Sequence, residues 1–369
     1  VVLEIPAASD KASLYGQIVD HWQITIADVG PSGVDQGKGG KILLTPPGYN
    51  EPVPDDYIEI KSPSYRLTFA FRSVPGPESS PAQAYEYAQT MKMYYFSELP
   101  NPAPTKFMDP IDMRYSTLPQ YDESWFEELY KIVSAEEVFS RDKVMMGMLA
   151  SLGIQKGKPY NPDEKTKKAM RQVAVDAYFY MQNRFLNPED PSRIWWPGKH
   201  WYDVLFHDEN RGFVYEYPDR IDLDDRADRY YCGTYYSKTV SDKPAVYYLM
   251  ALADKHGDEL QGGKTYSLTM PARVPIQQFW SLNIYDLETF AFIYNPLDRA
   301  GLSSLDLPNM QKNDGGSVTL YFGPQPPEGL ESNWIPTEGK RPLPVVRLYG
   351  PTDEFYDRSW ELPDVELRD

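Results

Sequence analysis

The pattern of hydrophobic residues changes twice along the chain and divides it into three zones. The first zone, residues 1–80, gathers β-branched and aromatic residues in short runs, at residues 15–26, 41–45 and 65–72. Such runs are typical of β-strands. A glycine-rich loop at residues 30–40 and the turn Pro46-Pro47-Gly48 separate them. This zone is therefore predicted to be β structure.

The second zone, residues 81–190, repeats its apolar residues at helical spacing. One such series runs from Trp125 to Val133, and a stronger one from Met170 to Phe185. Upstream of the second series, Asn161-Pro162-Asp163-Glu164 combines a capping residue, a first-turn proline and acidic residues. This zone is predicted to be a helical block.

The third zone, residues 191–369, returns to the β pattern. Its strand candidates are residues 245–253, 265–270, 279–285, 317–322 and 345–349. The segment Asp254-Lys255-His256-Gly257 lies between the first two and predicts a hairpin loop there.

Composition narrows the classes of partner. The chain has 369 residues with 37 Lys and Arg against 54 Asp and Glu, a formal net charge of −17. This charge argues against nucleic acid and against anionic lipid as partners. A single cysteine, Cys232, rules out an internal disulfide framework and a Cys-rich zinc site, and it reads as a buried hydrophobe. Apolar runs fall short of the ~20 residues that cross a bilayer, so membrane insertion is not predicted.

Motifs for phosphate, dinucleotide and nucleophile chemistry fail on spacing. In a phosphate loop built on Gly37-Lys38, the first glycine would stand at Ser32 and a Ser or Thr would replace Gly39. A dinucleotide loop would need glycine at Ile42. No Gly-x-Ser-x-Gly sequence is present. A loop connecting strands is the preferred interpretation of residues 30–40, and no cofactor is predicted.

Two segments carry weaker metal signals. His200 and His207 stand seven residues apart among acidic residues, which leaves metal-assisted hydrolysis of small esters or amides as an alternative function. The acidic residues of the second segment lack the Gly and the terminal Glu of a calcium loop and read first as a solvated loop, with calcium as the alternative; they are Asp222, Asp224, Asp225 and Asp228. Neither segment predicts a metal site.

Longer strings resemble two families. Asp20-His21-Trp22-Gln23, Ala27-Asp28-Val29-Gly30 and Pro46-Pro47-Gly48-Tyr49 resemble domain-of-unknown-function family 1254. Phe279-Trp280-Ser281, Asn333-Trp334-Ile335-Pro336-Thr337 and Arg347-Leu348-Tyr349-Gly350-Pro351 resemble its usual partner, family 1214.

The resemblance implies an α+β, mainly β fold: two jelly-roll-like antiparallel β-sandwiches with a helical block between them. The corresponding domains are a partial first sandwich at residues 1–80, the block at 81–190 and a second sandwich at 191–369. Such proteins often carry export signals, which implies a periplasmic or secreted location. Members of the first family usually begin well before Val1, so we expect the missing strands to come from a separate chain, a cleaved fragment or a partner protomer.

The family has no established reaction to transfer, and whether the protein is an enzyme stays open. The 29 Tyr and 8 Trp suit either β-sheet packing or contact with flat polar ligands. The first hypothesis is therefore binding, with or without hydrolysis, of a polar glycan-like ligand. Its candidate residues are Asp20, Trp22, Gln23, Trp280, Tyr285 and Asp286, because aromatic faces stack on sugar rings while carboxylates and amides bond hydroxyls. A structural protein that assembles into a defined homo-oligomer is the second hypothesis.

Overall fold

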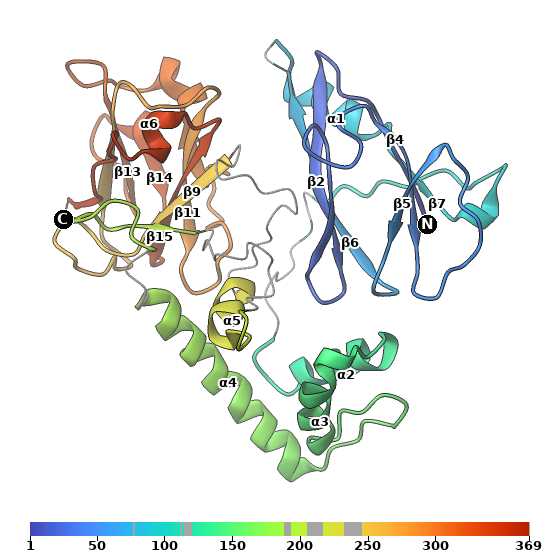
Figure 1. Cartoon of the computed structure of the whole chain (residues 1–369). Helices are drawn as coiled ribbons and strands as arrows, with labels where there is room; N and C mark the ends of the chain where they lie inside the picture. Colours follow the sequence, from blue (N-terminus) through green and yellow to red (C-terminus); the bar gives the residue numbers. More distant parts are fainter. Residues whose placement is uncertain are drawn as a thin grey trace. The chain divides into compact units, whose positions relative to one another are not determined.

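The structure, a computed structural model, describes residues 1–76, 78–110, 113, 120–187, 193–204, 217–231 and 246–368, with side chains at 228–231 left aside. The chain divides into two compact units, residues 1–181 with 210–239 and residues 182–209 with 240–369. Each unit contains a pair of β-sheets (Figure 1). The predicted class, α+β and mainly β, is confirmed. The domain boundaries after residues 80 and 190 stay a prediction.

The first unit contains one four-stranded and one three-stranded sheet. Their orders are β5-β4-β1-β7 and β3-β2-β6. The strands are β1 Val2–Ile5, β2 Ala12–Asp20, β3 Thr25–Val29, β4 Gly40–Thr45, β5 Tyr57–Lys61, β6 Leu67–Pro75 and β7 Lys92–Tyr94. The pairing of β4 with β5 is parallel, whereas the other pairings of this unit are antiparallel. The predicted sandwich is thus mixed rather than purely antiparallel.

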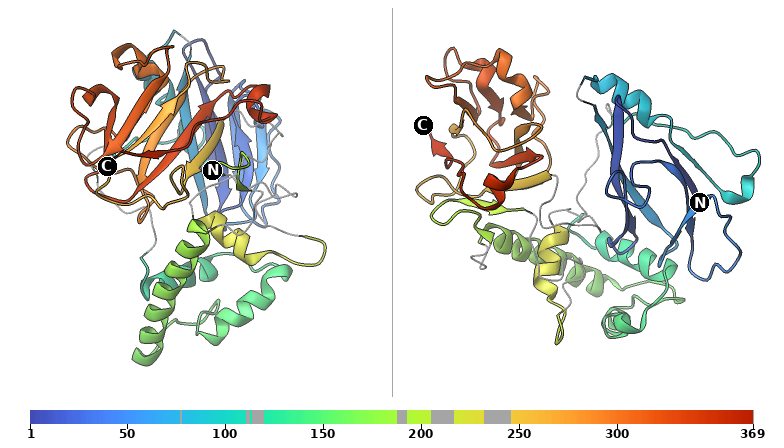
Figure 2. Two further views of the ribbon diagram at one scale, coloured as in Figure 1. Left: turned by 90° about the vertical axis from the view of Figure 1, so that its left-hand side faces the viewer. Right: turned by 45° about the horizontal axis from the view of Figure 1, so that its top comes forward.

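Aliphatic residues from both sheets form the core of this first sandwich. Leu3 and Ile42 of one sheet meet Leu14 and Ile18 of the other, and all four are almost fully buried. Helix α1, Pro81–Ala88, packs against β6 and β2 and is drawn in cyan in Figure 2. Ser80 caps α1 in a capping box with Gln83, and Pro81 occupies the first turn. Sequence and packing therefore agree on where this helix begins.

The predicted strand at residues 15–26 is wrong, because it is two strands joined by a tight turn. The backbone reverses between β2 and β3, where Asp20 Oδ1 accepts hydrogen bonds from the N–H groups of Trp22 (2.9 Å) and Ile24 (2.8 Å). Gln23 adopts a positive φ of 63°. The apolar residues on both sides of the turn continue the strand pattern and hide it in the sequence.

Three further helices complete most of the first unit. They are α2 Ser124–Ala135, α3 Lys143–Ser151 and α4 Glu164–Leu186, whose last residues belong to the second unit. Short 3-10 turns lie at Phe96–Glu98 and Ser140–Asp142. Asp163 caps α4, since its Oδ1 accepts the N–H of Thr166 at 2.7 Å. The helix therefore starts two residues later than a cap at Asn161 would place it.

A small helical core connects this block to the first sandwich. Phe126, Val133, Met170 and Ala174 are buried in it, and Trp22 from the β2–β3 turn packs against them. The periodic residues of the sequence thus do build the helix interfaces.

The second unit also contains two β-sheets. Their strand orders are β12-β11-β15-β9-β8 and β14-β13-β10-β16. The strands are β8 Trp201–Asp203, β9 Val246–Ala251, β10 Tyr266–Met270, β11 Trp280–Asp286, β12 Gly301–Ser303, β13 Val318–Gly323, β14 Trp334–Pro336, β15 Pro342–Tyr349 and β16 Glu366–Leu367. A four-residue helix, α6 Asp353–Tyr356, and 3-10 turns at Ser304–Asn309 and Glu331–Asn333 connect strands. The β13–β14 pairing is parallel and the other pairings here are antiparallel, so this sandwich is mixed as well.

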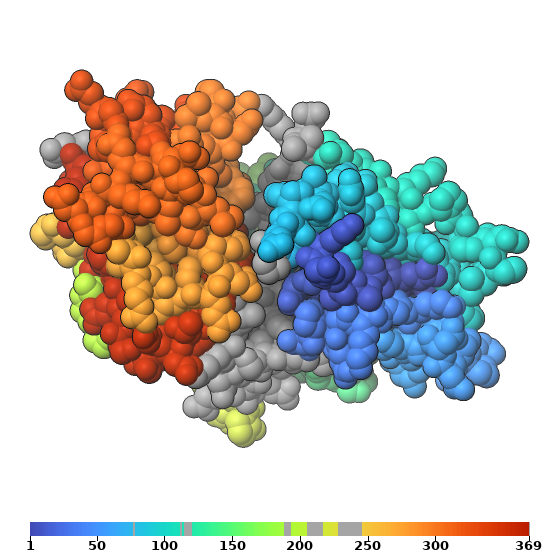
Figure 3. All heavy atoms as spheres, turned by 90° about the horizontal axis from the view of Figure 1, so that it is seen from above, coloured from blue at the N-terminus to red at the C-terminus, as the bar shows by residue number. Residues whose placement is uncertain are grey.

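Large aromatic side chains fill the second sandwich. Trp195, Trp196 and Trp201 lie in one continuous core with Phe322 and Phe355. The orange and red atoms of this unit pack against one another over the face seen in Figure 3. The predicted pairing of residues 245–253 with 265–270 is wrong, because β9 and β10 belong to different sheets. The predicted loop itself does reverse the chain: Ala253 and Glu259 form an antiparallel bridge across it, and the N–H of Asp254 donates to the Asp258 carbonyl oxygen at 2.9 Å.

The acidic segment predicted as a loop is instead the start of a helix, α5 Leu223–Tyr231. Asp222 caps it, because its Oδ1 accepts the N–H of Asp225 at 3.1 Å. Asp224 and Asp225 stand in the first turn, where negative charge is favoured by the helix dipole. Capping thus accounts for the acidic residues whose side chains are described.

Among the helices in the described part of the chain, none has the length and apolar character needed to cross a membrane.

Candidate ligand-binding site

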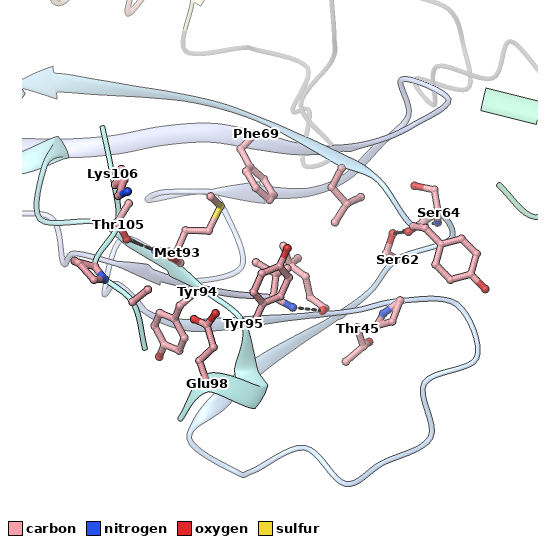
Figure 4. Close-up of a pocket in the computed structure, with 17 residues that line it drawn as sticks. Thr45, Ser62, Ser64, Phe69, Met93, Tyr94, Tyr95, Glu98, Thr105 and Lys106 are labelled. Atoms are coloured by element: carbon pink, nitrogen blue, oxygen red, sulfur yellow. Dashed lines mark hydrogen bonds between the residues drawn. The ribbon is translucent and has the colours of Figure 1, made fainter. Parts of the chain in front are cut away.

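One pocket in the first sandwich lies where the two sheets and the segment after β7 meet. It encloses about 670 Å³, within the ~300–1,000 Å³ range of small-molecule sites. Residues from β4, β6 and β7 line it, together with residues 95–106 (Figure 4). We call this hollow the first-sandwich pocket.

The sheets supply the inner wall of the pocket. Leu44 and Thr45 come from β4, and Leu67 and Phe69 come from β6. Thr45 is buried and its hydroxyl donates to Glu59 Oε1 at 3.1 Å. Leu67 and Phe69 are half-buried: they pack against the sandwich core and also line the hollow. The inner wall is therefore mainly apolar.

The outer wall carries exposed aromatic and charged side chains. Tyr95 is 64% exposed, and Met93 and Glu98 beside it are exposed as well. Figure 4 shows Tyr95 in the middle of the pocket, with Lys106 toward one end and Ser64 toward the other. The N–H of Met93 donates to Thr105 Oγ1 at 2.8 Å, which holds the returning chain beside β7. This wall can thus offer a ring face to a ligand.

Electrostatics distinguish the two tyrosines of this wall. Tyr94 is buried and its hydroxyl donates to Glu4 Oε1 at 2.7 Å. Burial first, and the neighbouring Glu4 carboxylate second, raise the pKa of Tyr94 above its ordinary value, so its hydroxyl stays neutral. Lys92 donates to Glu4 and is the main cause that lowers the pKa of that carboxyl. Tyr94 is therefore fixed in the structure, whereas Tyr95 is free to contact a ligand.

The described lining of the pocket carries two charged side chains, Glu98 and Lys106. The side chains of Glu98 and Lys106 make no hydrogen bond or ion pair with the described residues, so both charges are available to a ligand. Glu98 is the single carboxylate among the described residues that line the pocket. Hydrolysis by a carboxylate pair requires two at a defined separation. The arrangement suits binding of a ligand with ring faces and hydroxyl groups.

One end of the pocket is held by a buried carboxylate from the helices. Glu136, at the end of α2, accepts the N–H of Tyr65 through Oε2 at 2.7 Å and pairs through Oε1 with His21 Nδ1 at 2.7 Å. Its Oε1 also accepts the N–H of Arg66 at 3.3 Å. Because Tyr65 lines the pocket, this carboxylate positions its rim.

The sequence-predicted residues of the first sandwich lie at the β2–β3 turn and do not line this pocket. Asp20 is buried and holds the turn, and Gln23 is exposed at its positive-φ position. Trp22 is half-buried against the helical core. Their proposed ligand role stays a prediction, whereas their contacts in the structure shape the turn.

The sequence-predicted residues of the second sandwich lie on β11. Trp280 is 4% exposed in the core and offers no free ring face. Asp286 is buried at the end of the strand, where Lys340 Nζ donates to it at 3.0 Å. Tyr285 lies on the opposite face of the sheet from Trp280 and stacks on Phe292, with ring centroids 4.6 Å apart. Tyr285 alone of these three combines an aromatic ring with a partly open position.

The metal hypothesis finds little support among the described residues, where no group of three His, Cys, Asp or Glu side chains gathers. His200 is bound to the C-terminal segment, since its N–H donates to Asp364 Oδ1 at 2.9 Å and its Nδ1 lies 3.6 Å from Oδ2. His207 and Cys232 lie outside the described residues.

The outer-wall residues of the first-sandwich pocket, from Met93 to Lys106, escaped sequence analysis because they fall in the zone predicted as helical. A usable signal exists: the run Met93-Tyr94-Tyr95-Phe96 precedes Pro100, Pro102 and Pro104. Closely spaced prolines exclude a continuous helix and favour an extended segment. An aromatic run ahead of such a segment is a reasonable sign of a strand with exposed rings.

Comparison with known proteins gives family and fold. The profile described as "Protein of unknown function (DUF1254)" matches residues 1–95, and "Protein of unknown function (DUF1214)" matches residues 245–353. The predicted pairing of these families is confirmed. No curated protein matches the sequence.

Two solved structures resemble the whole chain. The VPA0106 protein from Vibrio parahaemolyticus is 16% identical with a TM-score of 0.57, over 100% of this chain and 85% of its own. A putative uncharacterized protein from Burkholderia cenocepacia is 10% identical with a TM-score of 0.35, over 100% of this chain and 71% of its own. The first of these similarities supports the fold.

Proposed function

We propose that the first sandwich of this chain, which matches the DUF1254 profile over residues 1–95, binds a polar, glycan-like ligand. The observation that carries the proposal is the exposed ring of Tyr95 in a pocket of about 670 Å³. Aromatic faces stack on the C–H faces of sugar rings. Glu98 and Lys106 supply the hydrogen bonds that would fix hydroxyl groups.

Binding rather than hydrolysis is the better-supported part of this proposal. A single carboxylate lines the described pocket, which leaves no acid–base pair of the kind that glycoside hydrolysis uses. The extracytoplasmic location and the homo-oligomer remain proposals. Light scattering of the purified protein tests the oligomer, and a monomer would contradict it.

The test is to titrate the protein with maltotriose, cellotriose and triacetylchitotriose, and to measure binding by isothermal titration calorimetry and saturation-transfer NMR. We expect at least one to bind, and Tyr95→Ala to weaken that binding about tenfold, which corresponds to ~1.4 kcal/mol. Glu98→Gln should weaken it less, because a neutral amide still bonds hydroxyl groups.

The matched control is Tyr85→Ala, since Tyr85 is also exposed (55%) but lies on α1 and does not line the pocket. It should bind as the wild type does. Absence of binding to all three sugars, or equal losses in Tyr95→Ala and Tyr85→Ala, would contradict the proposal.

A further inference from the structure

An arginine without an acidic partner lies on the outer face of the five-stranded sheet in the second sandwich. Arg347 of β15 is half-buried, and among the described residues no carboxylate pairs with it. Its Nη2 donates to the hydroxyl of Tyr285, and its Nε is buried without a hydrogen-bond partner. A guanidinium is always charged, and a charge withdrawn from water without a counter-ion is unfavourable. The position therefore calls for an anion.

Aromatic rings surround this guanidinium. Its Cζ lies 5.1 Å from the ring centroid of Tyr248, 5.8 Å from that of Tyr285 and 6.0 Å from that of Phe292. These cation–π contacts hold the guanidinium in place but leave its charge unneutralised. Burial raises the pKa of Tyr285, so its hydroxyl stays protonated and does not serve as the counter-ion.

A polar hollow of about 480 Å³ lies beside this arginine on the same sheet. Ser281, which is paired with Arg347 across β11 and β15, lines it together with Asn283 and Phe292. The ring of Phe292 is 50% exposed and thus borders both the hollow and the guanidinium. Ser281 Oγ donates to Asn283 Oδ1 at 2.8 Å, which directs the amide nitrogen of Asn283 away from that bond.

The charges around the hollow select a single negative charge. Asp298 and Asp306 line its other side, and Asp306 is held by the N–H and hydroxyl of Ser303. The nearby cation of the lining, Arg299, already donates to the backbone oxygens of Glu331 and Trp334. One available cation facing two carboxylates disfavours a multiply charged anion such as phosphate.

We propose that Arg347, Tyr285 and Phe292 form a binding site for a small monocarboxylate with a ring-shaped body. The carboxylate binds the guanidinium, the ring stacks on Phe292, and the remaining polar groups meet Ser281 and Asn283. This site is built from the second sandwich alone and is independent of the first-sandwich pocket.

The experiment titrates the full chain with benzoate, benzyl alcohol and inorganic phosphate, followed by saturation-transfer NMR and calorimetry. We expect benzoate to bind at least tenfold more tightly than benzyl alcohol, and phosphate to bind more weakly than benzoate. Arg347→Met keeps the apolar stem and removes the charge, so it should abolish the preference for benzoate. Arg347→Lys should retain part of it.

Two further variants make the result interpretable if Arg347→Met fails to fold. Phe292→Ala removes an exposed ring and leaves Arg347 intact, so it should weaken benzoate binding several-fold. Arg273→Met is the control, because Arg273 is an exposed arginine paired with Glu354 outside the hollow. The proposal is overturned by equal affinity of the wild type for benzoate and benzyl alcohol, by phosphate binding as tight as benzoate, or by unchanged benzoate binding in Phe292→Ala or in folded Arg347→Met.

Discussion

The two sandwiches of this chain solve the same packing problem with different side chains. The second is filled by tryptophans and other rings, among them Trp196 and Trp201, which are at most 1% exposed. The buried core of the first is entirely aliphatic, and its rings at Phe69 and Phe71 are only half-buried. The pocket of the first sandwich is lined by residues of both its sheets, whereas the hollow of the second lies along one sheet, at Ser281 and Asn283 of β11.

The comparison explains why the two candidate sites differ in kind. The first-sandwich pocket is bounded by residues of both sheets and is mainly apolar on its inner side. The site around Arg347 lies on the outside of one sheet and is polar.

The largest expected effect comes from removing a ring from the filled core. Trp201 is fully buried and its Nε1 donates to the Pro363 carbonyl oxygen at 3.0 Å. Trp201→Ala should lower the free energy of unfolding of the second unit by roughly 3–5 kcal/mol. Hydrogen exchange of the β10 and β13 amides measures this loss.

The counterpart in the first sandwich is Phe69→Ala, which should cost only about 1 kcal/mol because its ring is half-buried beside a hollow. Hydrogen exchange of the β2 amides measures this loss of unfolding free energy. Equal losses in the two variants would remove the distinction between the cores.

A smaller effect is expected at the carboxylate that connects the helices to the first sandwich. The side chain of Glu136 is fully buried and bonds the backbone N–H of Tyr65 and the ring of His21. Glu136→Gln removes the charge and one acceptor, and should destabilise the first unit by about 2 kcal/mol. Urea unfolding followed by the fluorescence of Trp22 and Trp125 measures it.

Its neighbour provides the control. Glu137 contacts only the hydroxyl of exposed Tyr65, at 3.3 Å, so Glu137→Gln should change stability little. If both variants behave alike, the buried carboxylate does not connect the two parts.

The smallest effect concerns pH and the β2–β3 turn. Burial raises the pKa of Asp20 above its ordinary 3.8, in spite of the backbone N–H groups of Ile24 and Trp22, which lower it. The folded state therefore binds the proton more tightly, and wild-type stability falls as the pH rises from about 3.8 through the folded pKa.

Asp20→Asn removes this titration but keeps an oxygen acceptor for the turn. The variant should gain stability relative to the wild type at pH 7 and show no such gain at pH 3. Asp10 is exposed, so Asp10→Asn should have the same stability as the wild type at pH 7 and at pH 3. Thermal unfolding at both pH values measures the stability of the two variants. A lower stability of Asp20→Asn than of the wild type at pH 7 would contradict the prediction and show that the charge supports the turn.

Much of the second sandwich follows from the sequence, since the strands predicted at residues 279–285, 317–322 and 345–349 are β11, β13 and β15. These strands bury apolar residues on one face, so their pattern is unambiguous. The turn after β2 does not follow from the pattern, because Asp20 and the backbone of Gln23 decide it while apolar residues continue on both sides. The start of α4 could be predicted to within two residues from the segment 161–164, in which Asp163 is the cap.

The candidate sites could be predicted less well. The first-sandwich pocket joins segments near residues 45, 65 and 95, and its existence depends on how two sheets separate. Tyr285 was the one predicted residue that the proposed carboxylate site contains. Its importance depends on Arg347, a partner 62 positions along the chain, and pairing over such a separation is set by sheet register and not by local pattern.

The buried carboxylate of Glu136 also has a mechanical consequence. Glu136 follows the last residue of α2, and its side chain accepts the backbone N–H of Tyr65, which lines the pocket. The backbone oxygen of Glu136 accepts a hydrogen bond from Lys156 Nζ. A displacement of α2 is therefore transmitted to Tyr65 without passing through solvent or a flexible linker. A ligand that binds the pocket more tightly in one position of α2 than in another would therefore shift α2 toward that position.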